Sequence, residues 1–347
     1  MKAQRLLVTG GAGFIGSHFI RLWLTRHPED YILNLDVLTY AGSRARLADL
    51  EHHPHYQFLQ GDICDTETVR TATQGCQLVV HCAAETHVDR SITNAAPFLR
   101  TNIEGTCMLL QHARAAGVAR FIHVSTDEVY GPILSGAVDE RAPLAPRSPY
   151  AASKAAGDLM AQAFHETYDV PTVVVRPTNI YGPGQFPEKF IPLIITNSSD
   201  GLPIPIYGDG QQRRAWLFVT DLCEALEAVI ERGEPGTIYN IAGGTEQANL
   251  ETAKLILSRL NLSTERLQSV TDRPGHDRRY AMTDAKLRAL GWQPKTSFEH
   301  GVAETIAWYR QHEDWWRPLA RTLREDSYHW LNRSPGSGAQ QPSRIIR

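Results

Sequence analysis

Two neighbouring carboxylates, Asp127 and Glu128, lie in the stretch STDEVYG, directly after the apolar run RFIHV. That run is typical of a buried strand, and the end of a buried strand is an unfavourable place for two unpaired charges. A protonated and an ionised carboxyl side by side can serve as acid and base in one reaction, provided that their environments differ. A helix cap or a surface pair of acids is the alternative for this position taken alone.

Tyr150 and Lys154 form a second reactive pair, in SPYAASKAAGD. A helix predicted to begin after Pro149 places the two residues four apart and so on one face. An ammonium group close to a phenol favours the phenolate and lowers the pKa of the phenol. Tyr150 is therefore a candidate base that takes the proton of a sugar or alcohol hydroxyl as that hydroxyl is oxidised.

A glycine-rich turn, LLVTGGAGFIGSH, places Gly10, Gly13 and Gly16 between a predicted strand and a predicted helix. This spacing allows a tight turn, close approach of the backbone to a pyrophosphate, and packing of the helix on the sheet. The next predicted strand ends in Asp36, whose carboxylate can accept hydrogen bonds from an adenosine ribose. An acid there repels a 2′-phosphate, so the pattern predicts NAD rather than NADP. A plain tight turn with a solvated strand end is the alternative.

Two further strand ends fit the same dinucleotide. Asp62-Ile63 follows the run YQFLQ, and Cys82-Ala83-Ala84 closes the run QLVVHC. A dinucleotide lies across the carboxyl edge of such a sheet, so we expect the first pair beside the adenine and the small residues beside the pyrophosphate.

Composition excludes several classes of protein. The chain has 347 residues, of which 42% are hydrophobic and 21% charged, and a formal net charge of -3. That balance is typical of an ordinary globular protein and gives no reason to expect nucleic acid or an anionic membrane as a partner. The five cysteines include no C-x-x-C pair, so no disulfide framework or metal site is predicted. The N-terminus lacks the pattern of a signal peptide, so we expect a cytoplasmic protein.

A layered fold is needed to bring these residues together. Apolar runs rich in β-branched residues alternate with amphipathic segments such as 14–27 and 98–116. This alternation predicts an α/β fold, namely a Rossmann-type doubly wound parallel sheet with a smaller C-terminal substrate-binding lobe. The predicted strands are RLLVT, YILNLD, YQFLQ, QLVVHC, RFIHV and PTVVVR.

The regular alternation ends near residue 176, where prolines and glycines interrupt it. We expect an NAD-binding Rossmann domain over 1–176, to which a later segment of about 214–245 returns, and a lobe over 177–330 that builds a binding site. The tail 333–347, rich in Pro, Gly, Ser and Gln, is predicted to be disordered.

Within the lobe, helical patterns occupy 221–232, 250–260 and 299–312. The last of these carries or precedes a group of aromatic residues that indicates core packing or a subunit contact. These residues are Trp308, Tyr309, Trp315 and Trp316.

The glycine spacing, Ser125 with Thr126, and the Tyr150/Lys154 pair together resemble the extended short-chain dehydrogenase/reductases. Within that superfamily, residues 4–318 are similar to the dTDP-glucose 4,6-dehydratases. The stretches that carry this closer resemblance are DVLTYAG, GDICD, AAETHVDRSI, TNIEGT, STDEVYG, PYAASKAAGD, FPEKFIPL and RPGHDRRYAMTDAKLRALGW.

The resemblance implies a reaction for the two carboxylates. In such enzymes NAD takes a hydride from sugar C4 while the tyrosine takes the hydroxyl proton, and the new ketone acidifies the proton at C5. Glu128 would remove that proton, Asp127 would protonate the departing C6 hydroxyl, and Thr126 would hydrogen-bond the C4 oxygen. Return of the hydride to C6 gives a 4-keto-6-deoxy sugar. Epimerising and decarboxylating relatives typically lack the Asp-Glu pair, so elimination is favoured.

The resemblance also implies binding residues, and a homodimer paired through the segments 98–116 and 150–168. The implied cofactor contacts, besides the glycines, Asp36 and the strand ends, are Phe14, Ile15, Leu38, Thr39, Gly42, Thr86, Thr101, Ser125, Tyr150 and Lys154. The lobe 177–330 would mainly bind the sugar nucleotide. The implied substrate contacts are His87, Asp89, Arg90, Asn179, Lys189, Phe190, Pro205, Tyr207, Arg214, Asn249, Arg273 and His276. His87, Asp89 and Arg90 have an ion pair that fixes their loop as an equal alternative.

The chain departs from the pattern of this family at three positions, Val37, Ile180 and Ala215, where a lysine, a second asparagine and an acid are frequent. These changes leave the nucleotide base open. The alternatives are another nucleotide-sugar 4,6-dehydratase or an epimerase acting on a UDP-hexose, and a non-catalytic NAD-binding regulator. A regulator would need the dinucleotide loop but not the two carboxylates.

Overall fold

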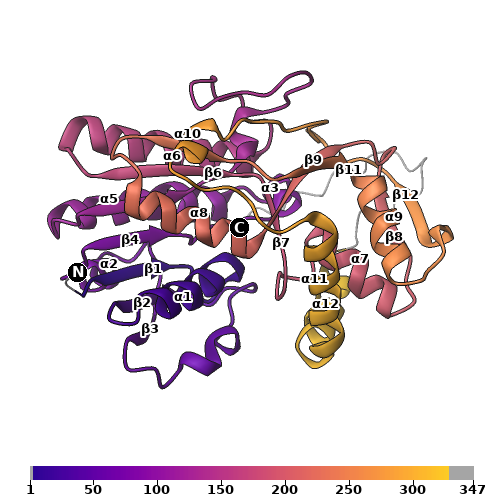
Figure 1. The fold of residues 1–347 in the computed structure, drawn as a ribbon, viewed down its shortest axis with the longest axis horizontal. Helices are drawn as coiled ribbons and strands as arrows, with labels where there is room; N and C mark the ends of the chain where they lie inside the picture. The colour runs from indigo at the N-terminus through magenta and orange to yellow at the C-terminus, as the bar shows by residue number, and fades with distance from the viewer. Residues whose placement is uncertain (1–2, 328–347) are drawn as a thin grey trace, which may run out of the picture.

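The computed structural model describes residues 3–327, and the predicted tail 333–347 lies outside them. Its largest element is a sheet of seven parallel strands that runs through the larger part of the molecule (Figure 1). The predicted Rossmann-type doubly wound sheet is confirmed. In spatial order the strands are β10 (Ile238–Ile241), β6 (Thr172–Pro177), β5 (Arg120–Val124), β4 (Leu78–His81), β1 (Arg5–Thr9), β2 (Tyr31–Asp36) and β3 (Tyr56–Gln60).

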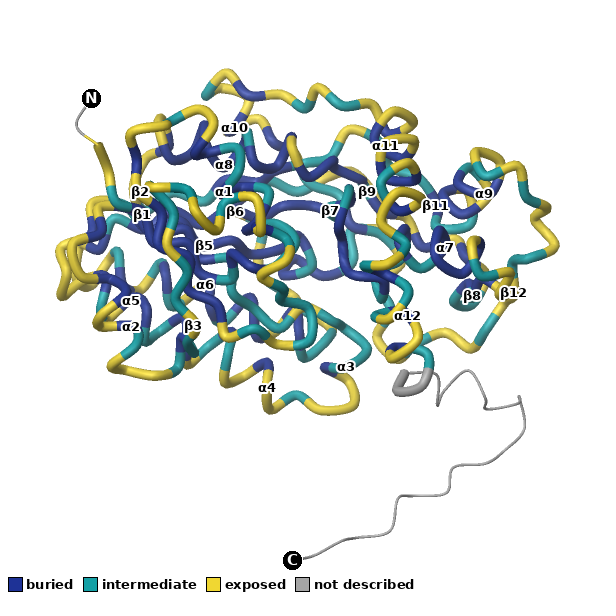
Figure 2. The backbone as a smooth tube through the Cα atoms, turned by 90° about the horizontal axis from the view of Figure 1, so that it is seen from below, coloured by how far each residue is buried: buried dark blue, intermediate teal, exposed yellow. Residues whose placement is uncertain are grey.

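Both faces of this sheet are buried, because successive residues of each strand point to opposite sides. Leu6 and Val8 belong to one apolar cluster and Leu7 to the other. The first cluster also takes in α1 (Phe14–Arg26), α8 (Val219–Arg232) and α10 (Ala285–Ala289). The second takes in α2 (Thr66–Thr73), α5 (Thr106–Ala115) and α6 (Pro149–Tyr168). The buried strands form the dark centre of this part in Figure 2.

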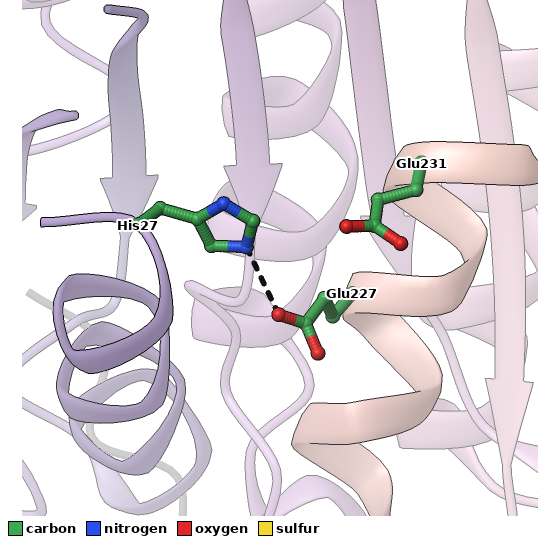
Figure 3. Close-up of side chains that lie close together, drawn as sticks. All are labelled: His27, Glu227 and Glu231. Carbon is green, nitrogen blue, oxygen red and sulfur yellow. Dashed lines mark hydrogen bonds and ion pairs between the residues drawn. The ribbon is translucent and has the colours of Figure 1, made fainter. Parts of the chain in front are cut away.

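An ion-pair cluster fastens α1 to α8 on the first face (Figure 3). His27, which follows α1, lies with its Nε2 2.9 Å from a carboxylate oxygen of Glu227, and Arg26 bonds the other oxygen. Glu231 lies one turn further along α8. Both oxygens of Glu227 already have cationic or imidazole partners, so the arrangement is that of an ion-pair cluster between two helices rather than a cation site.

Shorter elements connect the strands at their carboxyl ends. On the second face, α3 (Val88–Thr93) and α4 (Ala96–Leu99) lead through a π-helical turn at Arg100–Gly105 into α5. Tight 3-10 turns lie at Arg44–Leu50, Asp127–Tyr130 and Thr264–Arg266. The predicted helix over 98–116 is therefore interrupted by a change of helical type.

The smaller lobe has a core of its own, which lies at the carboxyl edge of the large sheet (Figure 1). It contains two small sheets: β7 (Asn179–Tyr181), β9 (Arg213–Phe218) and β11 (Thr245–Ala248) in one, and β8 (Ile204–Tyr207) with β12 (Leu267–Val270) in the other. Four helices cover them: α7 (Phe190–Ser199), α9 (Asn249–Arg259), α11 (Phe298–Gln311) and α12 (Glu313–Ser327).

The boundary between the two parts is crossed more than once. Helix α8 and strand β10, both inside the segment 214–245, pack on or join the large sheet. Leu287 and Trp292 also pack there, although we expected their segment in the lobe. Among the aromatic residues, Tyr309 and Trp316 are buried in the core of the lobe, which favours core packing for them.

No helix within residues 3–327 combines the length and the apolar character that a membrane crossing requires.

Candidate active site

The two carboxylates lie where the large sheet meets the lobe. Strand β5 ends at Val124, and the chain turns at Thr126, whose hydroxyl oxygen accepts the backbone N–H of Glu128 at 3.3 Å. This capping bond opens the 3-10 turn that carries both acids. Asp127 is buried and lines the larger of two neighbouring cavities, whereas Glu128 is half-buried and lines both.

Asp127 and Glu128 have different environments, as an acid and base pair requires. Burial, reinforced by the neighbouring Glu128 carboxylate, raises the pKa of Asp127 to about 7. Asp127 is therefore substantially protonated near neutral pH. The Tyr280 hydroxyl lies 3.3 Å from a Glu128 carboxylate oxygen and 2.9 Å from one of Asp277, and it can donate its single proton to one of the two. The pair has the asymmetry expected from its position in the sequence.

Tyr150 and Lys154 lie on α6, beside the carboxylates. Ser148 caps the helix by accepting the N–H of Ala151, and Pro149 occupies its first turn. Both reactive side chains are buried, and the Lys154 ammonium donates to the carbonyl oxygen of Val124 at 2.6 Å. Burial lowers the pKa of Lys154 to about 8.

The pKa of Tyr150 is raised, first by burial and then by the Glu128 carboxylate. The sequence indicates only the opposite effect, a lowering of this pKa by the nearby Lys154 ammonium. In this structure the phenol needs further positive charge beside it before it can act as a base near neutral pH.

The larger cavity, of about 840 Å³, follows the carboxyl edge of the sheet and is shaped by glycines. At Gly10, which has a φ of +71°, a Cβ atom would lie 2.6 Å from the Ala83 nitrogen. At Gly16, a Cβ would lie 2.5 Å from the Gly10 carbonyl oxygen. Only glycine fits either position, so the loop stays open toward the cavity at the start of α1.

Asp36 stands at the end of β2 in the wall of this cavity. Its carboxylate accepts the N–H groups of Ala12 at 2.9 Å and Leu38 at 2.8 Å, and these bonds fix its orientation. Burial raises the pKa of Asp36, while the two amides oppose that shift. Leu38 itself has a φ of 58° and lies outside the wall, where its amide positions the acid.

Nearly all predicted cofactor residues share the wall of this cavity; Leu38 and Lys154 are outside it, and Lys154 is buried. The predicted residues in the wall are Gly10, Gly13, Phe14, Ile15, Gly16, Asp36, Thr39, Gly42, Asp62, Ile63, Cys82, Ala83, Ala84, Thr86, Thr101, Ser125 and Tyr150.

The smaller cavity, of about 230 Å³, extends from Glu128 into the lobe. Arg90 is outside its wall, since its guanidinium lies 3.8 Å from the Tyr40 ring centre and 3.7 Å from a Glu188 oxygen. The ion-pair alternative therefore describes Arg90 better. The predicted residues that line this cavity are His87, Asp89, Asn179, Lys189, Phe190, Pro205, Tyr207, Arg214, Asn249, Arg273 and His276.

Asp89 links two other residues of the wall of the smaller cavity through hydrogen bonds. It accepts from the Tyr207 hydroxyl at 2.9 Å and from Arg273 at 3.1 Å. Arg214 is held by the backbone carbonyl groups of Arg213 and Asp277, at 2.8 Å and 3.0 Å. The two arginines give the cavity positive charge that suits a diphosphate, against the negative net charge of the whole chain.

Comparison with known proteins identifies the family. A profile described as GDP-mannose 4,6 dehydratase matches residues 7–305. A dTDP-glucose 4,6-dehydratase of Streptomyces niveus is 49% identical, over 91% of this chain and 96% of that one. The chain belongs to the dTDP-glucose 4,6-dehydratase family.

Solved structures agree with this family. A dTDP-glucose 4,6-dehydratase from Streptomyces venezuelae with NAD and dTDP bound has a TM-score of 0.89 and 49% identity, covering 91% of this chain and 99% of that one. A UDP-glucose 4-epimerase from Thermus thermophilus in complex with NAD has a TM-score of 0.82 and 31% identity, over 89% and 99% of the two chains. The fold is thus shared with epimerases.

Several residues at the site of this dTDP-glucose 4,6-dehydratase family member were missed in the sequence. Glu188 lines both cavities, and Tyr280 contacts Glu128. Each lies inside a stretch that carries the family resemblance, FPEKFIPL or RPGHDRRYAMTDAKLRALGW, so a signal was present. Ala320, Leu323 and Arg324 of α12 also line the smaller cavity, and no motif marked them.

Proposed function

We propose that this chain catalyses the NAD-dependent dehydration of dTDP-glucose to dTDP-4-keto-6-deoxyglucose, as a hydro-lyase of deoxysugar biosynthesis. The observation that carries the proposal is the buried Asp127 beside the half-buried Glu128 where the two cavities meet. An oxidation alone needs only the tyrosine, and a regulator needs only the cofactor loop. Elimination of water needs an acid and a base together.

The larger cavity fits a dinucleotide. Its glycine loop leaves no room for a Cβ at Gly10 or Gly16, which is the cradle that a pyrophosphate requires at a helix N-terminus. The buried carboxylate of Asp36 suits ribose hydroxyls and repels a 2′-phosphate, so NAD is favoured over NADP. Bound NAD would supply the hydride acceptor for C4 and the hydride donor for C6.

Tyr150 takes the proton of the C4 hydroxyl in this proposal. Two positive charges can stabilise its phenolate: the Lys154 ammonium, one helical turn away, and the positive charge that an oxidised nicotinamide brings to the cavity. Thr126, at the end of β5, would hold the C4 oxygen by a hydrogen bond. The C4 ketone that results makes the C5 proton acidic.

Glu128 and Asp127 then act together on C5 and C6. Glu128 removes the C5 proton, and the electrons of that C–H bond form the C5–C6 double bond. Asp127 gives its proton to the C6 oxygen, which leaves as water. The hydride returns to C6 as C5 takes back a proton. Asp127 then regains a proton from solvent, and Tyr150 releases its proton to solvent.

The smaller cavity would hold the rest of the substrate. Lys189, Arg214 and Arg273 are positioned to neutralise a diphosphate, and Tyr207 can stack on the base. The Streptomyces relatives named for dTDP-glucose favour thymine over uracil, and the fold shared with a UDP-glucose 4-epimerase supports a UDP-hexose as the alternative.

A homodimer in the cytoplasm is part of the proposal. The helices expected to pair are those after β4 and β5, and Leu99, Leu159 and Tyr168 are exposed there, at 49%, 57% and 43%. An isologous contact would cover these apolar side chains. Light scattering measures this state directly, and a monomer would refute it.

Substrate labelled with deuterium at C4 tests the reaction. Incubation with dTDP-glucose and NAD is expected to give a product lighter by one water, with the deuterium at C6. UDP-glucose and GDP-glucose serve as controls for the base and are expected to react more slowly. An epimer of the substrate, or unchanged dTDP-glucose with turnover of another nucleotide sugar, would overturn the assignment.

A further inference from the structure

Thr178 connects the proposed acid to the lobe. It follows β6, and its backbone N–H donates to the carbonyl oxygen of Ile241 at 3.1 Å, which fixes the residue beside the large sheet. Its hydroxyl oxygen lies 3.1 Å from Oδ2 of Asp127 and 3.0 Å from the carbonyl oxygen of Ala215. Thr178 is only 5% exposed, so water does not compete freely for these bonds.

The two partners of this hydroxyl differ in kind. The Ala215 carbonyl can only accept a hydrogen bond, whereas Asp127 accepts through both oxygens when it is ionised and donates through one when it is protonated. A hydroxyl has a single proton to donate, so it can donate to Asp127 or to Ala215 but not fully to both. When the hydroxyl donates to Oδ2 of Asp127, that oxygen carries no proton of its own, so a protonated Asp127 then has its proton on Oδ1.

We propose that Thr178 is a positioning residue for the acid, holding Oδ2 of Asp127 so that the proton to be delivered resides on Oδ1. Oδ1 lies on the side of Thr126, whose hydroxyl oxygen is 3.4 Å away. That contact is too long to orient the carboxyl strongly, and Thr126 already accepts the N–H of Glu128. The inference rests on the proposed function, because it assumes that Asp127 is the acid.

Thr178 also suits the charge that the reaction creates. When the Oδ1–H bond breaks, the proton passes to the C6 oxygen, the C6–O bond breaks, and Glu128 holds the C5 proton. Asp127 is then a buried carboxylate, which is costly unless a donor faces it. The Thr178 hydroxyl is such a donor at Oδ2, and it needs no movement beyond rotation of its own proton.

Other groups also act on Asp127. Glu128 is adjacent on the same turn and raises its pKa, and Arg214 on β9 lowers it. Tyr150 on α6 and Tyr280 lie near enough for the Asp127 charge to raise the pKa of each phenol. Removing the Thr178 hydroxyl leaves all four groups in place and removes only its contacts with Asp127 and Ala215, of which the Asp127 contact alone acts on the acid.

The test compares Thr178→Val and Thr178→Ala, which lack the hydroxyl, with Thr178→Ser, which keeps it. Hydride transfer from C4 is followed by the absorbance of the reduced nicotinamide, and dehydration by single-turnover formation of product. We expect the rate of hydride transfer to change less than about threefold in Thr178→Val and Thr178→Ala. The rate of dehydration should fall at least about tenfold, because a hydrogen bond to a charged group contributes a factor of that size. Thr178→Ser is expected to restore dehydration.

The pH profile distinguishes positioning from a merely structural role. Dehydration requires protonated Asp127, so its rate falls as the pH rises through the Asp127 pKa. Loss of a donor to the carboxylate raises that pKa. The pH at which dehydration falls should therefore rise by about one unit in Thr178→Val and Thr178→Ala, and should return to the parent value in Thr178→Ser. NAD affinity and circular dichroism show whether each variant is folded.

Three outcomes decide the inference. The inference would be overturned if Thr178→Val or Thr178→Ala dehydrated the substrate at the parent rate with an unchanged pH profile. An equal loss of hydride transfer and dehydration in both variants would also overturn it, since the residue would then be structural. If the parent enzyme itself fails to dehydrate dTDP-glucose, the proposed function fails instead.

Discussion

The two cavities are built in different ways. The larger cavity, proposed to hold the cofactor and called the cofactor cavity below, is shaped by backbone: by glycines at positions where a Cβ would clash with the main chain, and by backbone N–H groups that orient Asp36. The smaller cavity, proposed to hold the sugar nucleotide and called the substrate cavity below, is shaped by side chains that bond across long separations in sequence. Tyr207 donates a hydrogen bond to Asp89, 118 residues away in sequence, and Arg273 donates to the same carboxylate from 184 residues away.

This difference explains where the chemistry lies. A backbone cradle is rigid and tolerates little variation, which suits a cofactor shared with epimerases of the same fold. A cavity of paired side chains can change its partners while the sheet stays the same. Asp127 and Glu128 lie where the two cavities meet, so in the proposed function they act on a sugar that lies between the two.

Replacing both acids should separate the two cavities most sharply. We expect Asp127→Asn with Glu128→Gln to lower dehydration by about 10⁴-fold or more, because general acid and general base each contribute about 10²- to 10⁴-fold. Slow exchange of the C4 hydride should continue, since Tyr150 and Lys154 remain. The measurement is C4 deuterium exchange beside product formation.

The matched control for the double variant is Glu104→Gln, which removes a carboxyl from the wall of the cofactor cavity alone. Glu104→Gln should dehydrate at nearly the parent rate. Dehydration by the double variant at the parent rate would show that the roles of these two acids are wrongly assigned.

Gly16→Ala should damage the cofactor cavity and spare the substrate cavity. The added Cβ would lie 2.5 Å from the Gly10 carbonyl oxygen and 2.6 Å from the Gly11 Cα, both backbone atoms. The loop must therefore shift, and NAD affinity is expected to fall about tenfold to a hundredfold, the range of roughly 1.4 to 2.7 kcal/mol. Calorimetric titration with NAD measures this change.

Gly244→Ala is the control for Gly16→Ala, because a Cβ at Gly244 meets nothing within 4 Å. It should bind NAD as the parent does. Unchanged NAD affinity in Gly16→Ala would mean that the loop is not the rigid cradle described above.

The same contrast determines what the sequence could predict. The strands, the glycine loop and Asp36 follow from local patterns, because neighbouring residues decide a turn or a strand. Arg90 was predicted to contact the substrate but contacts Tyr40 and Glu188 instead. These contacts join residues that are far apart in the sequence, so no local pattern predicts them. The raised pKa of Tyr150 depends on burial and on Glu128, which spacing along a helix does not reveal.

Helix α12 is the clearest case of a wall that no motif indicated. No helix was predicted over its residues, yet Arg324 lines the substrate cavity and donates to Asp200 at 2.6 Å and Asn197 at 3.1 Å. Arg317, two turns earlier, bonds the same Asp200 but lies outside the cavity wall. The two arginines thus share an ion-pair partner and differ in their access to substrate.

Arg324→Ala and Arg317→Ala therefore form a matched pair with the smallest expected effect. Each loses a partly exposed ion pair with Asp200, and Arg317→Ala also loses one with Glu313; each pair is worth about 1 kcal/mol or less, so both variants should lower thermal stability, Arg317→Ala slightly more. Only Arg324→Ala widens the substrate cavity. We expect its KM for dTDP-glucose to rise about twofold to fivefold, with kcat and NAD affinity unchanged. A wall contact that is equally strong in the bound substrate and in the transition state affects binding alone. Equal KM values in the two variants would remove α12 from the substrate site and leave it as a purely structural helix.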